Sequence, residues 1–180
     1  MLDVAERLVQ TRGFNGFSYA DVARKLGLTK ASLHYHFPGK AELGEALISR
    51  YSGRFARRLE DIDREVTGAR AKLDAYIGIY SEVLSDGRMC LCGILAAEYE
   101  TLPQPMRDGV SEFFEMNETW LTSVLTRAQD EGGLSINGAP AEASQMIVSG
   151  LEGAMLIART RGGSARFQAT ADRLVETFIP

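Results

Sequence analysis

Residues 18–40 read SYADVARKLGLTKASLHYHFPGK, and this stretch holds two helix starts separated by a glycine. Ser18 can cap a helix N-terminus, and Asp21 three residues later completes the spacing of a capping box. Thr29 can cap a second helix, and Gly27 suits the left-handed position that ends the first. The stretch therefore predicts two short helices joined by a tight turn.

We expect these helices over about 19–26 and 30–37, with Pro38 ending the second, because the residue before a proline is driven from helical dihedral angles. This arrangement is a helix-turn-helix, which presents its second helix to the major groove of DNA. Helix pairs joined by glycine also occur in helical proteins that bind no DNA. The apolar residues expected to set the angle between the helices are Val22, Ala23, Leu26, Leu33 and Phe37.

The whole stretch resembles the DNA-binding domain of TetR-family transcriptional repressors. The residues that match the family signature are Asp21, Val22, Ala23, Gly27, Leu28, Thr29, Ala31, Ser32, Leu33, Tyr35, His36, Phe37 and Lys40. The sequence departs at His34, where the family often has tyrosine. The resemblance covers about residues 1–50. It implies a three-helix DNA-binding domain at 1–45 and an effector-binding and dimerisation domain at 46–180.

The resemblance also implies which side chains meet DNA. His36 and Lys40 fall at phosphate-contacting positions, and an imidazole N–H or an ammonium can donate to phosphate oxygens. Lys30 and Ser32 are expected to read base edges. His36 has an alternative role as a structural histidine over the domain's own core. The full set expected at the DNA is Ser18, Thr29, Lys30, Ala31, Ser32, His34, Tyr35, His36 and Lys40.

The charge is divided along the chain, although the net charge is −4. Residues 1–60 contain ten Lys and Arg against six Asp and Glu, a charge of +4. Residues 61–180 contain ten against eighteen, a charge of −8. The basic part is the part with the helix-turn-helix, as binding to phosphate requires.

Several classes of protein are disfavoured. The sequence lacks the run of about 20 apolar residues that spans a membrane, and we expect a cytoplasmic protein without membrane contact. The resemblance to the TetR family implies that it is bacterial. Cys90 and Cys92 are the whole cysteine inventory, and neighbours so close make a poor disulfide and no metal cluster. Both histidines lie in the helix-turn-helix, and no catalytic triad or phosphate loop is present. We therefore expect no metal, no cofactor and no enzyme.

The remainder of the chain has helical periodicity. Leu43, Leu47, Tyr51, Phe55 and Leu59 recur every four residues, which predicts one long helix. We expect an all-α fold of about nine helices, and this plan also matches the TetR family. The helices beyond the helix-turn-helix are expected over about 40–66, 70–85, 90–100, 106–131, 141–161 and 165–178.

The helix at 141–161 is rich in small residues, which lets another helix approach closely. In the TetR family the last two helices of each subunit form a four-helix bundle across a two-fold axis, so the resemblance implies a homodimer. Two recognition helices about 34–36 Å apart, or a multiple, would read a palindrome. The small residues have the alternative of packing within one subunit. The residues assigned to the dimer are Met146, Gly150, Gly153, Ala154, Leu174 and Phe178.

The resemblance further implies a small-molecule effector, bound among the helices of about residues 60–160, whose binding releases the operator. Aromatic and methionine side chains with few polar groups suit a largely apolar molecule. The same residues have the alternative of forming the core. The candidate lining is Tyr76, Tyr80, Met89, Cys92, Leu95, Tyr99, Phe113, Met116, Asn117, Trp120, Met146, Glu152 and Met155.

The segment MCLCGILAAE at 89–98 resembles that of a TetR subgroup in which a cysteine opens this helix, and some of its members sense electrophiles or oxidants. A cysteine at a helix N-terminus has a lowered pKa, and Cys90 is nearer the start than Cys92. Buried free cysteines are usually inert. The sequence thus predicts an effector-released repressor. Its alternatives are a repressor switched through Cys90 and an architectural DNA-binding protein without an effector.

Overall fold

The computed structural model describes residues 1–132 and 138–178. Within them the chain is all α-helical apart from loops and one 3₁₀ turn, which confirms the predicted fold class. The helices are α1 (Leu2–Arg12), α2 (Tyr19–Leu26), α3 (Lys30–His36), α4 (Lys40–Glu65), α5 (Ala69–Ser85), α6 (Leu91–Ala96), α7 (Gln104–Asp130), α8 (Pro140–Thr160) and α9 (Gly163–Glu176), with the 3₁₀ turn η1 at Tyr99–Thr101.

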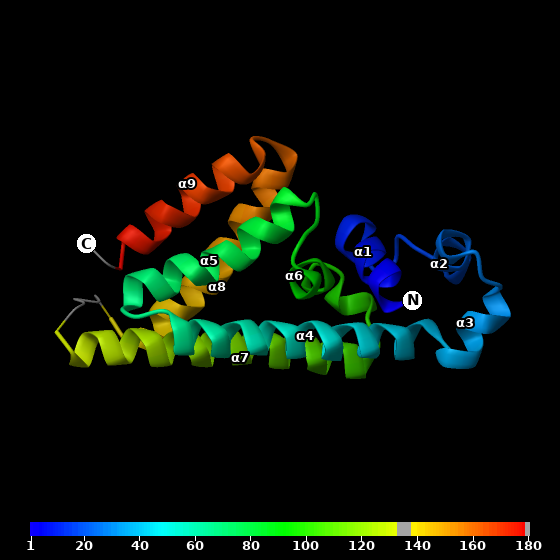
Figure 1. Ribbon diagram of the computed structural model, residues 1–180, viewed down its shortest axis with the longest axis horizontal. Helices are drawn as coiled ribbons and strands as arrows, with labels where there is room; N and C mark the ends of the chain where they lie inside the picture. Colours follow the sequence, from blue (N-terminus) through cyan, green and yellow to red (C-terminus); the bar gives the residue numbers. More distant parts are fainter. Residues whose placement is uncertain (133–137, 179–180) are drawn as a thin grey trace. The chain divides into compact units, whose positions relative to one another are not determined.

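The chain forms two compact units, and the long helices α4 and α7 each contribute to both. Unit 1 contains residues 1–54 and 88–113, that is α1–α3, the first part of α4, α6, η1 and the start of α7. Figure 1 shows α6 beside α1 within this unit. The contact is close between α4 and α7, since a Cβ added at Gly44 would lie 2.4 Å from the sulfur of Met106.

Unit 2 contains residues 55–87 and the chain from 114 onward, with α5, α8 and α9. Helix α9 turns back after Gly162 and packs against α8 and α5 (Figure 1). Gly150 permits a close approach to α9, since a Cβ there would lie 2.5 Å from a Leu174 methyl. The buried side chains include Tyr76, Leu151 and Phe167.

Most predicted helix bounds lie within one or two residues of the observed ones. The main exception is the helix expected over 90–100, which ends at Ala96 and gives way to η1. Glu98 leaves helical geometry at this point, with φ −108° and ψ 13°. Pro105 lies in the first turn of α7, where its missing N–H breaks no helical hydrogen bond. In the described part of the chain, no helix is long and apolar enough to cross a membrane.

Candidate nucleic-acid interface

Helix α2 begins at the predicted capping box. The backbone N–H and the hydroxyl of Ser18 both donate to Asp21 Oδ2, at 2.9 and 2.7 Å. These hydrogen bonds hold the pKa of Asp21 below its usual value, because they stabilise the carboxylate. Gly27 ends the helix in the left-handed conformation, with φ 66°. The local sequence therefore fixes both ends of α2.

Helix α3 begins with a side-chain cap and presents a polar surface. Thr29 Oγ1 accepts the N–H of Ser32 at 3.2 Å. Leu33 is buried beneath the helix, whereas the Tyr35 side chain is 85% exposed. Lys30, Ala31, His34 and His36 are also exposed, and Ser32 is partly so. We call α2, α3 and their turn the reader (residues 19–36).

The two histidines of the reader differ in their surroundings. The ring of His34 lies 4.7 Å from that of Tyr19, and its Nδ1 is 3.1 Å from the carbonyl oxygen of Pro38. His36 contacts the ring of Tyr35 edge-on, at 5.2 Å. His34 is thus tied to the reader itself, while His36 and Tyr35 lie at its surface.

Lys40 lies at the start of α4, but its ammonium contacts the protein. Lys40 Nζ donates to the carbonyl oxygens of Phe14 and Phe17, the latter at 2.6 Å. Burial lowers the pKa of Lys40, and the carboxylates of Glu98 and Asp21 oppose this shift. In the structure Lys40 therefore holds the loop between α1 and α2, and its contact with phosphate stays a prediction.

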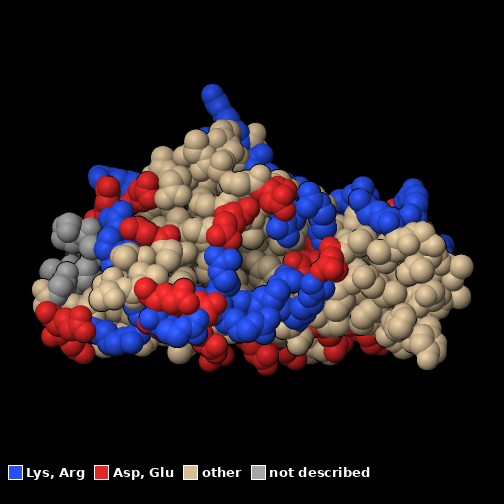
Figure 2. All heavy atoms as spheres, viewed as in Figure 1, with Lys and Arg blue, Asp and Glu red and all other residues tan. Residues whose placement is uncertain are grey.

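Positive charge within the reader lies on α2 and at the start of α3. Figure 2 shows Lys and Arg atoms over α2, and Arg24 and Lys25 of this helix are exposed. Lys30 adds an exposed ammonium at the start of α3. The reader thus combines exposed cations with hydroxyl and imidazole groups that donate hydrogen bonds, a composition suited to the DNA backbone.

In unit 2, four of the predicted effector residues come together. Tyr76 donates to Asn117 Oδ1 at 2.8 Å, and the hydroxyls of Tyr76 and Tyr80 lie 3.1 Å apart. The ring of Trp120 stacks on Tyr76 with centroids 5.5 Å apart. Phe55 contacts both tyrosines edge-on. These side chains pack directly on one another around a buried hydrogen-bonded centre.

The other predicted effector residues are divided between the two units. Met89, Cys92, Leu95 and Phe113 are buried in unit 1, where Tyr99 lies under the guanidinium of Arg107. In unit 2, Met155 is buried, Met116 and Glu152 are partly exposed, and Met146 is 55% exposed on α8. The set predicted from sequence therefore includes residues of both units.

A cavity of about 270 Å³ lies elsewhere in unit 2, and it contains none of the predicted effector residues. Asp63 at its wall accepts hydrogen bonds from Lys72 at 2.5 Å and Trp120 at 2.9 Å. Burial opposes ionisation of Asp63, but these donors outweigh it and hold its pKa below the usual value. The lining is Asp63, Val66, Thr67, Gly68, Ala69, Lys72, Val124, Arg127, Ala128 and Glu131.

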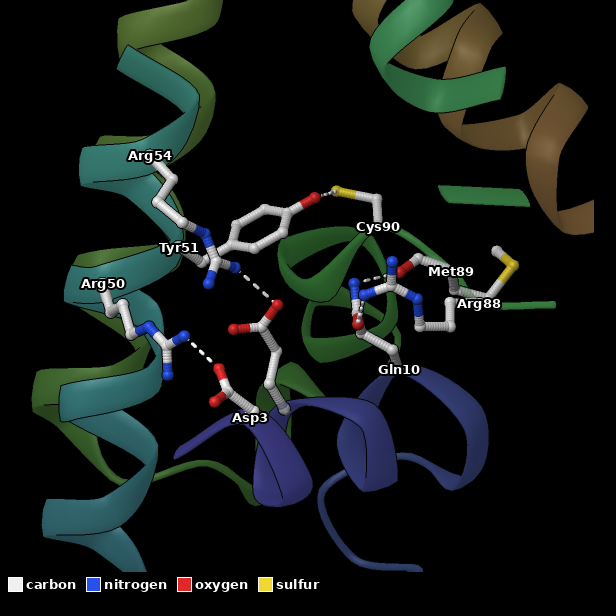
Figure 3. Close-up of polar contacts among 9 residues, drawn as sticks. Asp3, Gln10, Arg50, Tyr51, Arg54, Arg88, Met89 and Cys90 are labelled. Atoms are coloured by element: carbon white, nitrogen blue, oxygen red, sulfur yellow. Dashed lines mark hydrogen bonds and ion pairs between the residues drawn. The ribbon is translucent and has the colours of Figure 1, made fainter. Parts of the chain in front are cut away.

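Cys90 caps α6 through its sulfur. The Sγ atom accepts the N–H of Gly93 at 3.4 Å and faces the hydroxyl of Tyr51 at 3.6 Å. Figure 3 shows the Tyr51 ring directed at this sulfur. The side chain is 1% exposed. The predicted position at the helix start is correct, and the thiol is covered.

The predicted dimer residues divide into two groups. Gly150 and Leu174 contact each other inside the subunit, and Phe178 is buried. Met146 and Gly153 lie exposed on α8. Two further large apolar side chains of the same helix are exposed, Leu156 at 54% and Ile157 at 49%. The sequence had indicated Leu156 as part of the apolar area of this helix, whereas Ile157 was missed. The exposed apolar surface of α8 therefore contains Met146, Leu156 and Ile157.

Sequence reasoning also missed Glu98, Gln10 and Tyr19. Their polar groups bind backbone atoms far away in sequence, such as the Tyr19 hydroxyl on the carbonyl oxygen of Phe37 at 2.9 Å. The one local signal was a glutamate directly after the apolar run of 91–97. Among the described residues, no group of three or more His, Cys, Asp or Glu is placed to hold a metal ion.

Two protein-family models match the chain. One, described as bacterial regulatory proteins of the tetR family, matches residues 1–47. The other, described as a tetracyclin repressor-like C-terminal domain, matches residues 69–174. The two models cover the reader and most of unit 2, so both parts of the chain are similar to one family.

Individual proteins give the same result. A TetR-family transcriptional regulator from Agrobacterium tumefaciens has a crystal structure with a TM-score of 0.95 and 31% identity, covering 99% of this chain and 95% of that one. The transcriptional regulator AcuR of Cereibacter sphaeroides is 27% identical over 82% of this chain and 69% of its own. The nucleoid occlusion factor SlmA of Vibrio campbellii is 25% identical over 84% of this chain and 78% of its own.

Proposed function

The chain belongs to the TetR family of bacterial regulatory proteins and is a DNA-binding transcriptional regulator, and from this premise we propose that it is a repressor released by an effector. Residues 1–45 would bind a palindromic operator in the bacterial cytoplasm. The remainder would form a homodimer and bind a small, largely apolar molecule. The observation that carries the proposal is the exposed surface of α3, where Lys30, Tyr35 and His36 stand out from the buried Leu33.

The homodimer is supported by the exposed apolar surface of α8 (Met146, Leu156 and Ile157). A large apolar side chain left half-exposed gains free energy when a second surface covers it. A two-fold dimer repeats the same surface on both subunits, and it supplies the two readers that a palindrome needs.

The effector is supported by the aromatic cluster of Tyr76, Tyr80 and Trp120 around Asn117. Aromatic walls with one polar anchor are typical of sites for small apolar or aromatic molecules. The cluster is closely packed, so a ligand would have to displace a ring, for instance the partly exposed Trp120.

The test is selection of DNA from a random pool, followed by a compound screen for release. The proposal expects enrichment of a palindrome bound by two subunits, and compounds that raise the operator Kd. Two variants test the exposed surface of α3. Lys30→Ala should weaken operator binding, whereas the control Arg57→Ala, on the exposed face of α4, should leave it unchanged. Absence of any enriched sequence would refute the repressor.

As a second candidate we propose an architectural DNA-binding protein without an effector, and the similarity to a nucleoid occlusion factor supports a DNA-binding role other than repression. This candidate expects the same DNA selection but no release by any compound. The redox alternative at Cys90 has less support, because the thiol is covered and hydrogen-bonded. Treatment with a thiol alkylator decides it: release that persists in Cys90→Ser excludes Cys90 as the switch.

A further inference from the structure

The loop that joins α1 to α2, residues 13–17, is held between two opposite charges within unit 1. The carboxylate of Glu98 accepts the N–H of Phe14 at 2.6 Å and the N–H of Asn15 at 3.3 Å. From the other side, Lys40 Nζ donates to the carbonyl oxygens of Phe14 and Phe17. One residue, Phe14, is therefore bound by a carboxylate at its N–H and by an ammonium at its carbonyl group.

The fit around Glu98 is tight. Gly13 has φ +81°, and a Cβ added there would lie 2.6 Å from Glu98 Oε1. Beside it, Asn15 Nδ2 donates to Thr101 Oγ1 at 2.8 Å. On the Lys40 side, Nζ lies 4.6 Å from the centre of the Phe14 ring. An exposed ion pair contributes little to the stability of a protein. The contacts at this loop are more constrained in geometry than such a pair.

The same segment, residues 88–101, holds α1 at a second point. Gln10 is buried, and its Nε2 donates to the Met89 carbonyl oxygen at 3.0 Å. Its Oε1 accepts from Arg88 at 2.9 Å, and Met89 N–H donates to the Gln10 carbonyl oxygen at 3.1 Å. Figure 3 shows Gln10, Arg88 and Met89 gathered at this junction.

On its other side, α1 is attached to α4. Arg50 pairs with Asp3, as Figure 3 shows, and Arg54 pairs with the buried Glu6. Beyond the loop, the Tyr19 hydroxyl binds the carbonyl oxygens of Phe37 and Gly39, which ties the start of the reader to its end. The reader is therefore one piece, and the loop at 13–17 is one of its two covalent attachments.

We propose that Glu98 is a positioning residue for the reader. Its carboxylate fixes the loop at 13–17 to residues 88–101, opposite Lys40 of α4, and so fixes the direction in which α3 is presented to DNA. The inference rests on the proposed DNA-binding role of α3. A displacement of residues 88–101 would then move the reader through Glu98 and Gln10. Residues 88–101 need no contact with DNA for this effect.

The experiment compares Glu98→Ala, Glu98→Gln and the matched control Glu100→Ala, an exposed glutamate of η1. Kd for selected DNA should rise roughly tenfold in Glu98→Ala, which corresponds to a lost charge-assisted hydrogen bond. Glu98→Gln keeps one acceptor and should be intermediate, and Glu100→Ala should match wild type. The slope of log Kd against log salt should stay unchanged, because Glu98 neutralises no phosphate.

Amide hydrogen exchange without DNA supplies a second measurement. In Glu98→Ala, exchange should accelerate over residues 13–36 and stay unchanged in α8 and α9. An unchanged Kd, or accelerated exchange throughout the protein, overturns the positioning role. If the wild-type protein binds no DNA at all, the proposed function fails. The exchange of residues 19–36 in Glu98→Ala still tests the positioning role by itself. Faster exchange supports positioning by Glu98, and unchanged exchange overturns it.

Discussion

Replacing Leu156 by glutamate should dissociate the proposed homodimer. The Leu156 side chain is 54% exposed on α8, close in exposure to Met146 and Ile157. Full burial of such a side chain contributes about 1.5–3 kcal/mol, so covering the exposed half contributes about 1 kcal/mol. A two-fold interface contains Leu156 twice. The two copies together contribute about 2 kcal/mol to the free energy of dimerisation, which corresponds to a roughly 30-fold change in dimer Kd.

Leu156→Ala should therefore weaken the dimer by up to about 30-fold. Leu156→Glu should weaken it further, because burial of two carboxylates adds a desolvation cost. Sedimentation velocity over a range of concentrations measures the dimer Kd. The matched control is Leu28→Glu, which changes an exposed leucine (43%) of the reader. Equal dimer Kd values for Leu156→Glu and Leu28→Glu would refute the assignment of this surface.

Three further changes test the local structure. Thr29→Ala removes the cap of α3 and should cost about 1 kcal/mol, seen as faster amide exchange in α3, whereas Thr29→Ser should keep wild-type exchange. Tyr76→Phe removes the donor to Asn117 and should lower the free energy of unfolding in urea by about 1 kcal/mol; no change would contradict that bond. The pKa of Asp63 is lowered in the folded state, so its stabilisation is complete above the unfolded pKa and is lost as pH falls through the folded one. Asp63→Asn should therefore flatten the decline of stability in acid, and an unaltered pH profile would count against its contacts.

Local signals in the sequence predicted the reader well because local interactions build it. Ser18 and Asp21 form the expected capping box, and Thr29 caps α3 through contacts three residues away. Tyr76 and Tyr80 lie four residues apart in the helix predicted over 70–85, and in the structure their hydroxyls meet on one face of it.

Contacts between residues that are far apart in the chain could not be predicted from the sequence. Lys40 was assigned to phosphate because of its place in the motif, but its ammonium is held by carbonyl groups 23 and 26 residues away. Glu98 lies 84 residues from Phe14, and no periodicity links them. Phe178 was assigned to the dimer because it lies in the expected last helix, and in the structure it is buried within the subunit. Such placements depend on tertiary packing.

The central claim is that α3 reads DNA bases, and the most direct test is the ratio of Kd values for shuffled and selected DNA. Lys30 and Ser32 carry the polar atoms expected at base edges, so a variant with both replaced by alanine keeps the helix but removes this readout. A good base contact is worth about 1–3 kcal/mol, so we predict that the ratio falls about tenfold or more. An unchanged ratio in this variant would contradict base reading by α3.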